Sequence, residues 1–162
     1  MTSRNTRPRQ PLAPGRPVLG LPVLAVIGLA LLAAPRVVLH DLDVIHEGTF
    51  VNALFVFVPP VVWIAVALWK RVPNPFLTLL VVGLFHGVIL AAGHQLLWNS
   101  AFGGDPPALG GNLSDLDAAT QSAILRLFAA ISSVFTGVIV GAITGLVAWG
   151  LGRVVPPGSR TP

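Results

Sequence analysis

The sequence predicts an all-α integral membrane protein in which four transmembrane helices form a bundle. Hydrophobic residues make up 54% of the chain and charged residues only 10%, whereas soluble domains are nearer to a quarter charged. The apolar residues are gathered into four long runs, each close to or above the roughly 20 residues that span a bilayer core of about 30 Å. The charged residues lie almost entirely between these runs and are segregated by sign.

The four runs define one transmembrane domain over residues 18–152. Their bounds are 18–34, 50–69, 76–98 and 123–151. The tails, 1–17 and 153–162, are rich in Pro and in Arg or Gly, so we expect them to be disordered in the cytoplasm. The longest remaining segment, 99–122, is too short for a soluble domain. Because the chain has no Cys, disulfides and thiolate metal sites are excluded.

The sign of the charges predicts the orientation of the chain. All acidic residues lie in two of the gaps between runs: Asp41, Asp43, Glu47, Asp105, Asp115 and Asp117. Most basic residues lie in the other gap and in the tails, and short loops rich in Lys and Arg stay in the cytoplasm. Both termini are therefore predicted to be cytoplasmic, and the Arg-, Ala- and Gly-rich composition favours a bacterial plasma membrane. Trp69 and Trp149 would lie at the inner interface and Trp98 at the outer one.

The first run ends at Pro35, and proline tends to end the helix that precedes it. We therefore expect a separate, short amphipathic helix over Arg36–Glu47 on the outer membrane surface. Its apolar face would hold Val38, Leu42 and Ile45, and its polar face His40, Asp43 and Glu47. A longer, kinked first helix is the alternative. A cleaved signal peptide is disfavoured because residues 30–36 lack a small-x-small cleavage site.

The second run contains Pro59 and Pro60 near its middle. Neither has an N–H group, so the carbonyls of Phe55 and Val56 lose their helical partners. One hypothesis is a broken helix that lines a transport site, and the commoner alternative is a simple kink. The face expected to point inward holds Asn52, Pro59 and Trp63.

Small residues recur every four positions on the third and fourth runs, a spacing that lets two helices approach closely. The positions are Gly83 and Gly87 on the third run, and Ser133, Gly137, Gly141 and Gly145 on the fourth, with Thr144 on nearly the same face. The pattern predicts tight helix packing, within the chain or between copies of it. His86, near mid-membrane, and His94, toward the outer side, lie on or beside the packing face of the third run.

A cluster of ionisable residues marks the predicted outer side. Its members are His40, Asp41, Asp43, His46 and Glu47, with His94 and Arg126 expected at a similar depth. A charge near the membrane is costly unless it is paired, so we expect Arg126 to pair with Asp43 or Glu47. A divalent metal site is an alternative hypothesis, because imidazoles and a carboxylate can bind zinc. Its candidate ligands are His40, His46, Glu47 and His94.

His86 is an ionisable group inside a predicted span, which makes it a candidate functional residue. It could relay protons, or it could be a neutral imidazole bonded to Ser133 or Thr136. A haem is disfavoured, because no second His lies at matching depth on another span. The residues expected to form the polar interior are Asn52, His86, Arg126, Ser133, Thr136 and Thr144.

No motif in the sequence fixes a biochemical function, and no catalytic residue or cofactor is predicted. The leading hypothesis is a non-enzymatic membrane subunit or homo-oligomer that packs through its glycine faces. Its partners would be the lipid bilayer and either a second copy or a larger membrane complex. Nucleic acid is not expected, since the positive charges flank apolar runs. The alternatives are a small transporter or channel-like protein with a polar path near His86, and an outer-face metal-binding protein.

Overall fold

The computed structural model describes residues 18–154, and within this range the chain contains helices and loops but no strand. Four helical lengths are long and apolar enough to cross a membrane: Val23–Asp41, Phe50–Trp69, Pro75–Leu96 and Ala118–Val154. The predicted all-α class with four such lengths is therefore confirmed. The predicted disorder of 1–17 and of most of 153–162 falls outside the described residues, while Arg153 and Val154 continue the last helix.

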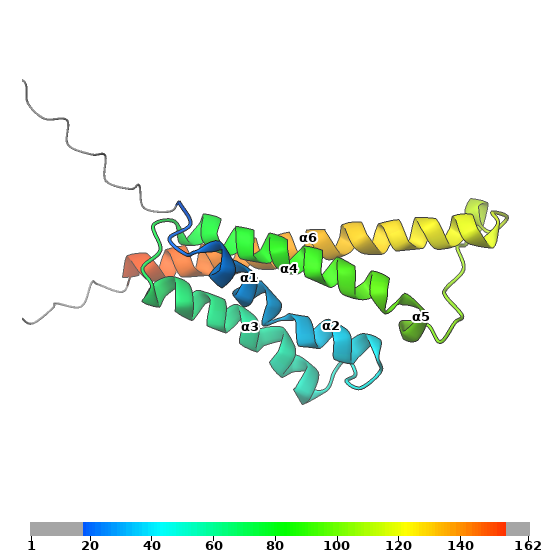
Figure 1. The fold of residues 1–162 in the computed structure, drawn as a ribbon, viewed down its shortest axis with the longest axis horizontal. Coiled ribbons are helices and arrows are strands. Elements are labelled where there is room, and N and C mark those ends of the chain that lie inside the picture. The colour runs from blue at the N-terminus through cyan, green and yellow to red at the C-terminus, as the bar shows by residue number, and fades with distance from the viewer. Residues whose placement is uncertain (1–17, 155–162) are drawn as a thin grey trace, which may run out of the picture.

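The first apolar length consists of two consecutive helices, α1 (Val23–Leu31) and α2 (Ala34–Asp41) (Figure 1). Pro35 has no N–H to offer to the Leu31 carbonyl, so α1 ends there. Proline is tolerated in a first helical turn, so the same residue begins α2. Near the break, the Leu29 carbonyl accepts a hydrogen bond of 2.7 Å from Trp63 Nε1 on the next helix.

The short helix predicted after the first run is present as α2, but it covers Ala34–Asp41 instead of Arg36–Glu47, and its inward face is not the one predicted. Together with α1 it makes one apolar length, Val23–Asp41, as in the alternative of a longer, kinked first helix. Helix α2 ends at Asp41. The buried residues of α2 and of the loop after it are Val37, Asp41 and Ile45, whereas Val38 and Leu42 are exposed. The physical reason is contact with α4 (Pro75–Leu96). Gly93 of α4 leaves room for Val37, since a Cβ at position 93 would lie 3.0 Å from Val37 Cγ1.

Thr49 caps the N-terminus of helix α3 (Phe50–Trp69), where its Oγ1 accepts a hydrogen bond from the Asn52 N–H at 3.2 Å. It continues through Pro59 and Pro60 as one α-helix, so the hypothesis of a broken helix finds no support in the backbone. The face predicted to point inward is buried, as expected: Asn52, Pro59 and Trp63.

Helices α4 and α6 (Ala118–Val154) pack with their glycine faces against each other. A Cβ added to Gly141 would lie 2.6 Å from the Leu79 carbonyl oxygen, and one added to Gly87 would lie 2.8 Å from Val134 Cα. Gly83 and Gly137 face each other in the same way. The predicted close approach thus occurs within one chain. These faces are occupied, so they offer no surface for self-association.

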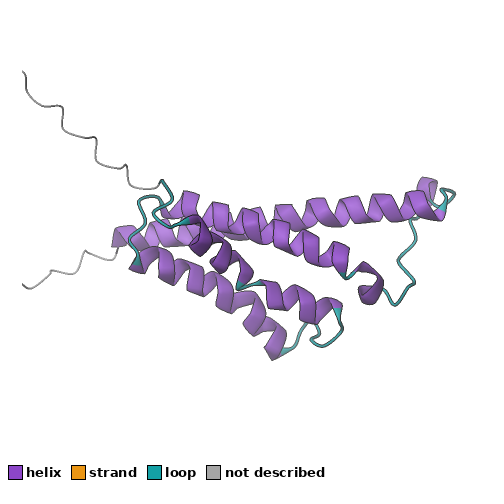
Figure 2. Cartoon of the chain, viewed as in Figure 1, coloured by secondary structure: helices purple, strands orange, loops and turns teal. Residues whose placement is uncertain are grey.

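Apart from the short break between α1 and α2, the connections between the helices lie toward two ends of the structure (Figure 2). One end, here the acidic end, is formed by the α2–α3 loop (42–49) and by residues 97–117, which include α5 (Trp98–Ala101) and a 3-10 turn (Gly111–Leu113). The other, here the basic end, holds the α3–α4 turn (70–74) and the first and last described residues (Figure 1). The segregation of charge along the sequence is therefore also a segregation in space. Toward the acidic end, α2 and α3 diverge from α4 and α6 (Figure 1).

Candidate functional site

A cavity of about 750 Å³ lies at the acidic end, and we call it the acidic-end cavity. Its walls come from the end of α2, the α2–α3 loop, the end of α4, α5 and the first half of α6. Its polar lining includes His40, Asp41, His46, Glu47, His94, Ser132 and Ser133. The structure therefore brings most of the ionisable cluster predicted from the sequence to one cavity.

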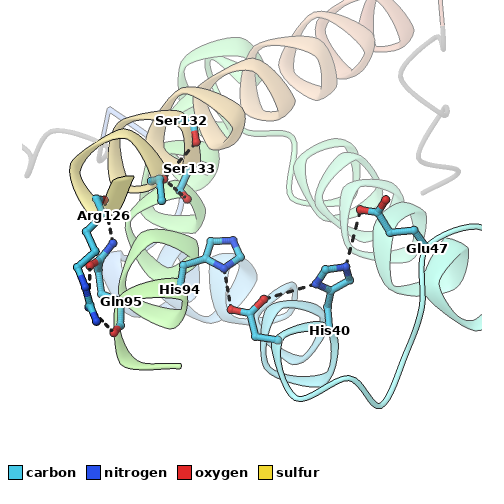
Figure 3. A network of polar contacts seen from close by, with 9 residues as sticks. His40, Glu47, His94, Gln95, Arg126, Ser132 and Ser133 are labelled. Carbon is cyan, nitrogen blue, oxygen red and sulfur yellow. Dashed lines mark hydrogen bonds and ion pairs between the residues drawn. The ribbon is translucent and has the colours of Figure 1, made fainter. Parts of the chain in front are cut away.

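Four side chains in this cavity form a line of alternating imidazoles and carboxylates (Figure 3). Asp41 Oδ2 lies 2.7 Å from His94 Nδ1, and Asp41 Oδ1 lies 3.5 Å from His40 Nδ1. The other ring nitrogen of His40 lies 3.7 Å from Glu47 Oε1. Asp41 is only 5% exposed, whereas the Glu47 side chain is 78% exposed. The line thus joins a buried carboxylate to the surface of the acidic end.

The chemistry of this line follows from its donors and acceptors. A carboxylate oxygen accepts hydrogen bonds, so the contact of Asp41 is satisfied in the His94 tautomer that carries its hydrogen on Nδ1. An imidazole can take up a proton on one nitrogen and release one from the other. The 2.7 Å contact therefore suits a buried carboxylate held by an imidazole, whereas the separations of 3.5 and 3.7 Å are too long for strong hydrogen bonds.

The candidate metal ligands are held in pairs instead of around one point. Among residues 18–154, no group of three or more His, Cys, Asp or Glu side chains is arranged to hold a metal ion. His94 contacts Asp41, and His40 lies between Asp41 and Glu47, while His46 Nδ1 pairs with Asp43 at 3.2 Å on the exposed loop. The geometry gives the metal hypothesis no support.

The predicted ion pair between Arg126 and Asp43 or Glu47 does not form. Arg126 Nη1 lies 3.4 Å from the Gln95 carbonyl oxygen, and the guanidinium lies 4.8 Å from the centre of the Trp98 ring. Trp98 is buried within the chain at the acidic end. Gln95 follows His94 on α4, and its Nε2 donates a hydrogen bond of 3.0 Å to the Arg126 carbonyl. This hydrogen bond links α4 to α6. Nothing in the sequence singled out Gln95.

A second cavity, of about 230 Å³, lies near the middle of the same helices, and we call it the central cavity. Its wall residues Arg36, Leu90 and Thr136 lie one helical turn further from the acidic end than His40, His94 and Ser132. The two cavities therefore follow one another between the α2–α3 and α4–α6 pairs. The apolar wall includes Phe55, Val56, Pro60, Trp63 and Val140.

The polar groups of the central cavity are Arg36, His86 and Thr136. Arg36 Nε donates a hydrogen bond of 3.1 Å to Asn52 Oδ1, which accounts for the predicted inward position of Asn52. His86 Nδ1 is buried and has no hydrogen-bond partner among the described residues, and the ring lies edge-on to Trp63 with 5.7 Å between ring centres. Arg36, for which the sequence predicts no role, thus lines the central cavity together with His86.

The other predicted interior residues have local roles. His86 does not form a hydrogen bond with Ser133 or Thr136. Ser133 Oγ instead donates a hydrogen bond of 2.7 Å to the Ala129 carbonyl of its own helix, and no hydrogen bond joins Thr136 to the His86 ring. Thr144 Oγ1 similarly donates 2.8 Å to the Val140 carbonyl. Both Ser133 and Thr144 are buried beside the glycine contacts of α6. They satisfy their hydroxyls within α6 and do not link the helices.

No protein-family model matches this chain, and neither a curated protein nor a solved structure does so. The fold and the cavities therefore define a class only. The chain is an all-helical protein whose four long apolar helices suggest a multi-pass membrane protein, with two consecutive polar cavities between its helices.

Proposed function

We propose that this chain is a small multi-pass membrane protein that gives a small solute a polar path, as a transporter or channel-like protein. The observation that carries the proposal is the central cavity, which places Arg36 and His86 between apolar helices and directly below the acidic-end cavity. The path would begin at the acidic end, pass the His94–Asp41 pair and reach His86.

Arg36 lies within the apolar length Val23–Asp41, five residues before its end. A charged side chain inside a membrane segment is costly unless it is paired or reaches water. A helix bundle with a purely structural role has no need of that cost. Charged side chains inside membrane segments usually face a water-filled cavity and mark a solute or ion path. His86 on α4 supports the same conclusion, because it faces the same cavity.

The proposed orientation has the acidic end outside a bacterial plasma membrane and both termini in the cytoplasm. Basic residues at the opposite end support it, since Lys and Arg are enriched in cytoplasmic loops. Lys70 Nζ lies 4.2 Å from the centre of the exposed Trp69 ring, and the Arg153 guanidinium lies 3.7 Å from the ring of Trp149. Exposed Trp beside a cation suits the headgroup region of a membrane.

The proposed function does not include self-association through the glycine faces. Gly83, Gly87, Gly137, Gly141 and Gly145 all have backbone atoms of the facing helix within the reach of an added Cβ. In the proposed function, the α4–α6 pair is the fixed frame against which α2 and α3 enclose the cavities.

Substituted-cysteine labelling tests the proposal, and the absence of native Cys gives a clean background. Leu90→Cys and Val140→Cys place a thiol at half-buried positions in the wall of the central cavity. Val88→Cys and Ile139→Cys are matched controls on the exposed faces of the same helices. The protein would be reconstituted in vesicles and treated with a membrane-impermeant thiol reagent from the acidic-end side.

We expect the two cavity thiols to react about tenfold or more faster than the two controls, because the reactive thiolate forms in water and not in lipid. Labelling of the cavity thiols at the rate of the controls would show that the central cavity is closed to water and would overturn the proposed path. Labelling only from the basic-end side would keep a path but reverse the proposed route of entry.

A further inference from the structure

We infer that the central cavity binds a small monovalent anion, of the class of short-chain carboxylates, with Arg36 as the principal binding residue. The inference deepens the proposed function and rests on it for the route by which the anion arrives. Binding itself can be measured without transport.

The formal charge of the central cavity comes from a single side chain. Arg36 is the one formally charged residue in the described wall of the central cavity, and none of the ion pairs found in residues 18–154 involves it. The nearest buried carboxylate along α2, Asp41, is already paired with His94 and His40. A cation held in apolar surroundings without a counter-ion is costly. An anion from outside the chain would supply what the chain does not.

The Arg36 guanidinium has N–H groups left for a ligand. Its Nε–H is used by Asn52 Oδ1 at 3.1 Å, and no other hydrogen bond of Arg36 is found within the described residues. The two terminal nitrogens therefore keep their N–H groups for a ligand. A planar pair of N–H groups matches the two oxygens of a carboxylate. Asn52 acts here as a positioning residue that holds the guanidinium plane.

The other residues in the wall of the central cavity supply a hydrogen-bonding atom and an apolar surface. His86 Nδ1 is buried without a partner among residues 18–154, so it is a spare hydrogen-bonding atom in the cavity. Phe55, Val56, Leu90 and Val140 supply an apolar surface opposite the polar groups. The volume of about 230 Å³ is below the roughly 300–1,000 Å³ of sites for drug-sized ligands. A carboxylate with a short alkyl chain satisfies the charge, the hydrogen bonds and the size together.

Calorimetric titration of the full-length, detergent-solubilised protein with sodium butyrate tests the inference. We expect saturable binding that Arg36→Gln weakens by about thirtyfold or more, because truncating one partner of a desolvated, hydrogen-bonded charge pair is costly. Trp63 touches His86 in the wall, so its fluorescence should change on binding. Trp69→Phe, at an exposed position outside the cavity, should leave both that signal and the calorimetric binding unchanged.

A second variant guards against a failure of Arg36→Gln to fold. Asn52→Asp puts a carboxylate beside Arg36 Nε, at the 3.1 Å contact, and so provides an internal anion. We expect it to keep or raise the thermal stability of the helix signal and to abolish butyrate binding. Wild-type butyrate affinity in folded Asn52→Asp and Arg36→Gln proteins would overturn the anion site. So would the absence of any saturable binding of butyrate or chloride to the wild type.

A lipid headgroup offers the same anionic chemistry as a free carboxylate. The titration is therefore repeated in vesicles of phosphatidylcholine alone and of phosphatidylcholine with phosphatidylglycerol. Loss of butyrate affinity in the second mixture would identify a lipid phosphate as the anion at Arg36, and equal affinity would identify the free carboxylate. Butyrate binding without labelling of Leu90→Cys would support the anion site and contradict the proposed path. Labelling of Leu90→Cys without anion binding would support the path and contradict the anion site.

Discussion

Asp41 and His94 join two helices through a single contact of 2.7 Å between Asp41 Oδ2 and His94 Nδ1. Asp41 ends α2 and His94 lies in the last turn of α4, and the carboxylate is almost fully buried. A buried carboxylate must be met by a donor, because its desolvation is otherwise uncompensated. The contact therefore fixes where α2 can lie against α4, and both residues form part of the wall of the acidic-end cavity.

The first prediction concerns this pair. His94→Ala removes the closer donor to Asp41, so we expect a loss of about 1–3 kcal/mol in the free energy of unfolding, measured by denaturant titration in mixed micelles. The matched control is His46→Ala, which breaks the 3.2 Å contact to Asp43 on the exposed loop and should cost about 0–1 kcal/mol. Equal losses in the two variants would contradict a structural role for the Asp41–His94 contact.

The second prediction concerns the glycine contact of α4 and α6. Gly141→Ala puts a Cβ 2.6 Å from the Leu79 carbonyl oxygen, so we expect it to push the helices apart at a cost of about 1–3 kcal/mol. Gly150→Ala is the control on the same helix, because its Cβ would meet nothing within 4 Å and alanine favours a helix by about 1 kcal/mol over glycine. Unfolding free energy separates the two variants, and size-exclusion chromatography with light scattering follows the association state. A change of association state in Gly141→Ala without a loss of stability would restore the hypothesis of self-association.

The sequence predicted the helices well because hydropathy and charge sign are local properties. Four apolar lengths, the inward face of α3 and the close approach of two glycine faces all follow from residue spacing on one helix. Spacing does not identify the partner of a face. For that reason Gly83 and Gly137 could be predicted to pack, but not to pack against each other.

The site was predicted only in part, for a similar reason. His40, Asp41, Glu47 and His94 were expected near one another, yet the choice of Asp41 as the shared carboxylate depends on how α2 turns against α4. Arg36 had no predicted role because Pro35 was taken as the end of the first helix. Proline at a first helical turn lets α2 follow α1 directly, and this places Arg36 within the apolar length.

The third prediction concerns Trp63, which is fully buried and donates from Nε1 to the Leu29 carbonyl at 2.7 Å. Trp63→Phe removes this bond and part of the ring, so we expect a loss of about 2–4 kcal/mol in the free energy of unfolding. Trp69→Phe is the control, since Trp69 is 76% exposed on the same helix and should cost about 0.5 kcal/mol or less. A Trp63→Phe protein as stable as the control would mean that the joint between α1 and α2 does not depend on this contact.

The fourth prediction concerns pH and the start of α6. The Thr120 hydroxyl, 2.6 Å from Asp117 Oδ2, and the Thr120 N–H, 3.0 Å from Oδ1, stabilise the carboxylate and lower the pKa of Asp117. A lowered pKa in the folded state adds stability that is present above the ordinary Asp pKa of about 3.9 and is lost as the pH falls through the lower folded value. We therefore expect hydrogen-exchange protection of the Thr120 amide, corrected for its intrinsic rate, to be constant above about pH 5 and to fall below about pH 4.

Asp117→Ala should abolish this pH dependence, because the group that titrates and accepts both bonds is gone. Asp115→Ala is the control, since Asp115 lies two residues away and its closest side-chain contact among the described residues is a 3.4 Å approach to Ser114 Oγ. It should keep the pH dependence of the Thr120 amide intact. If protection at Thr120 fell equally with pH in the Asp117→Ala protein, another group would be responsible, and Asp117 would not be the cap of α6, which begins at Ala118.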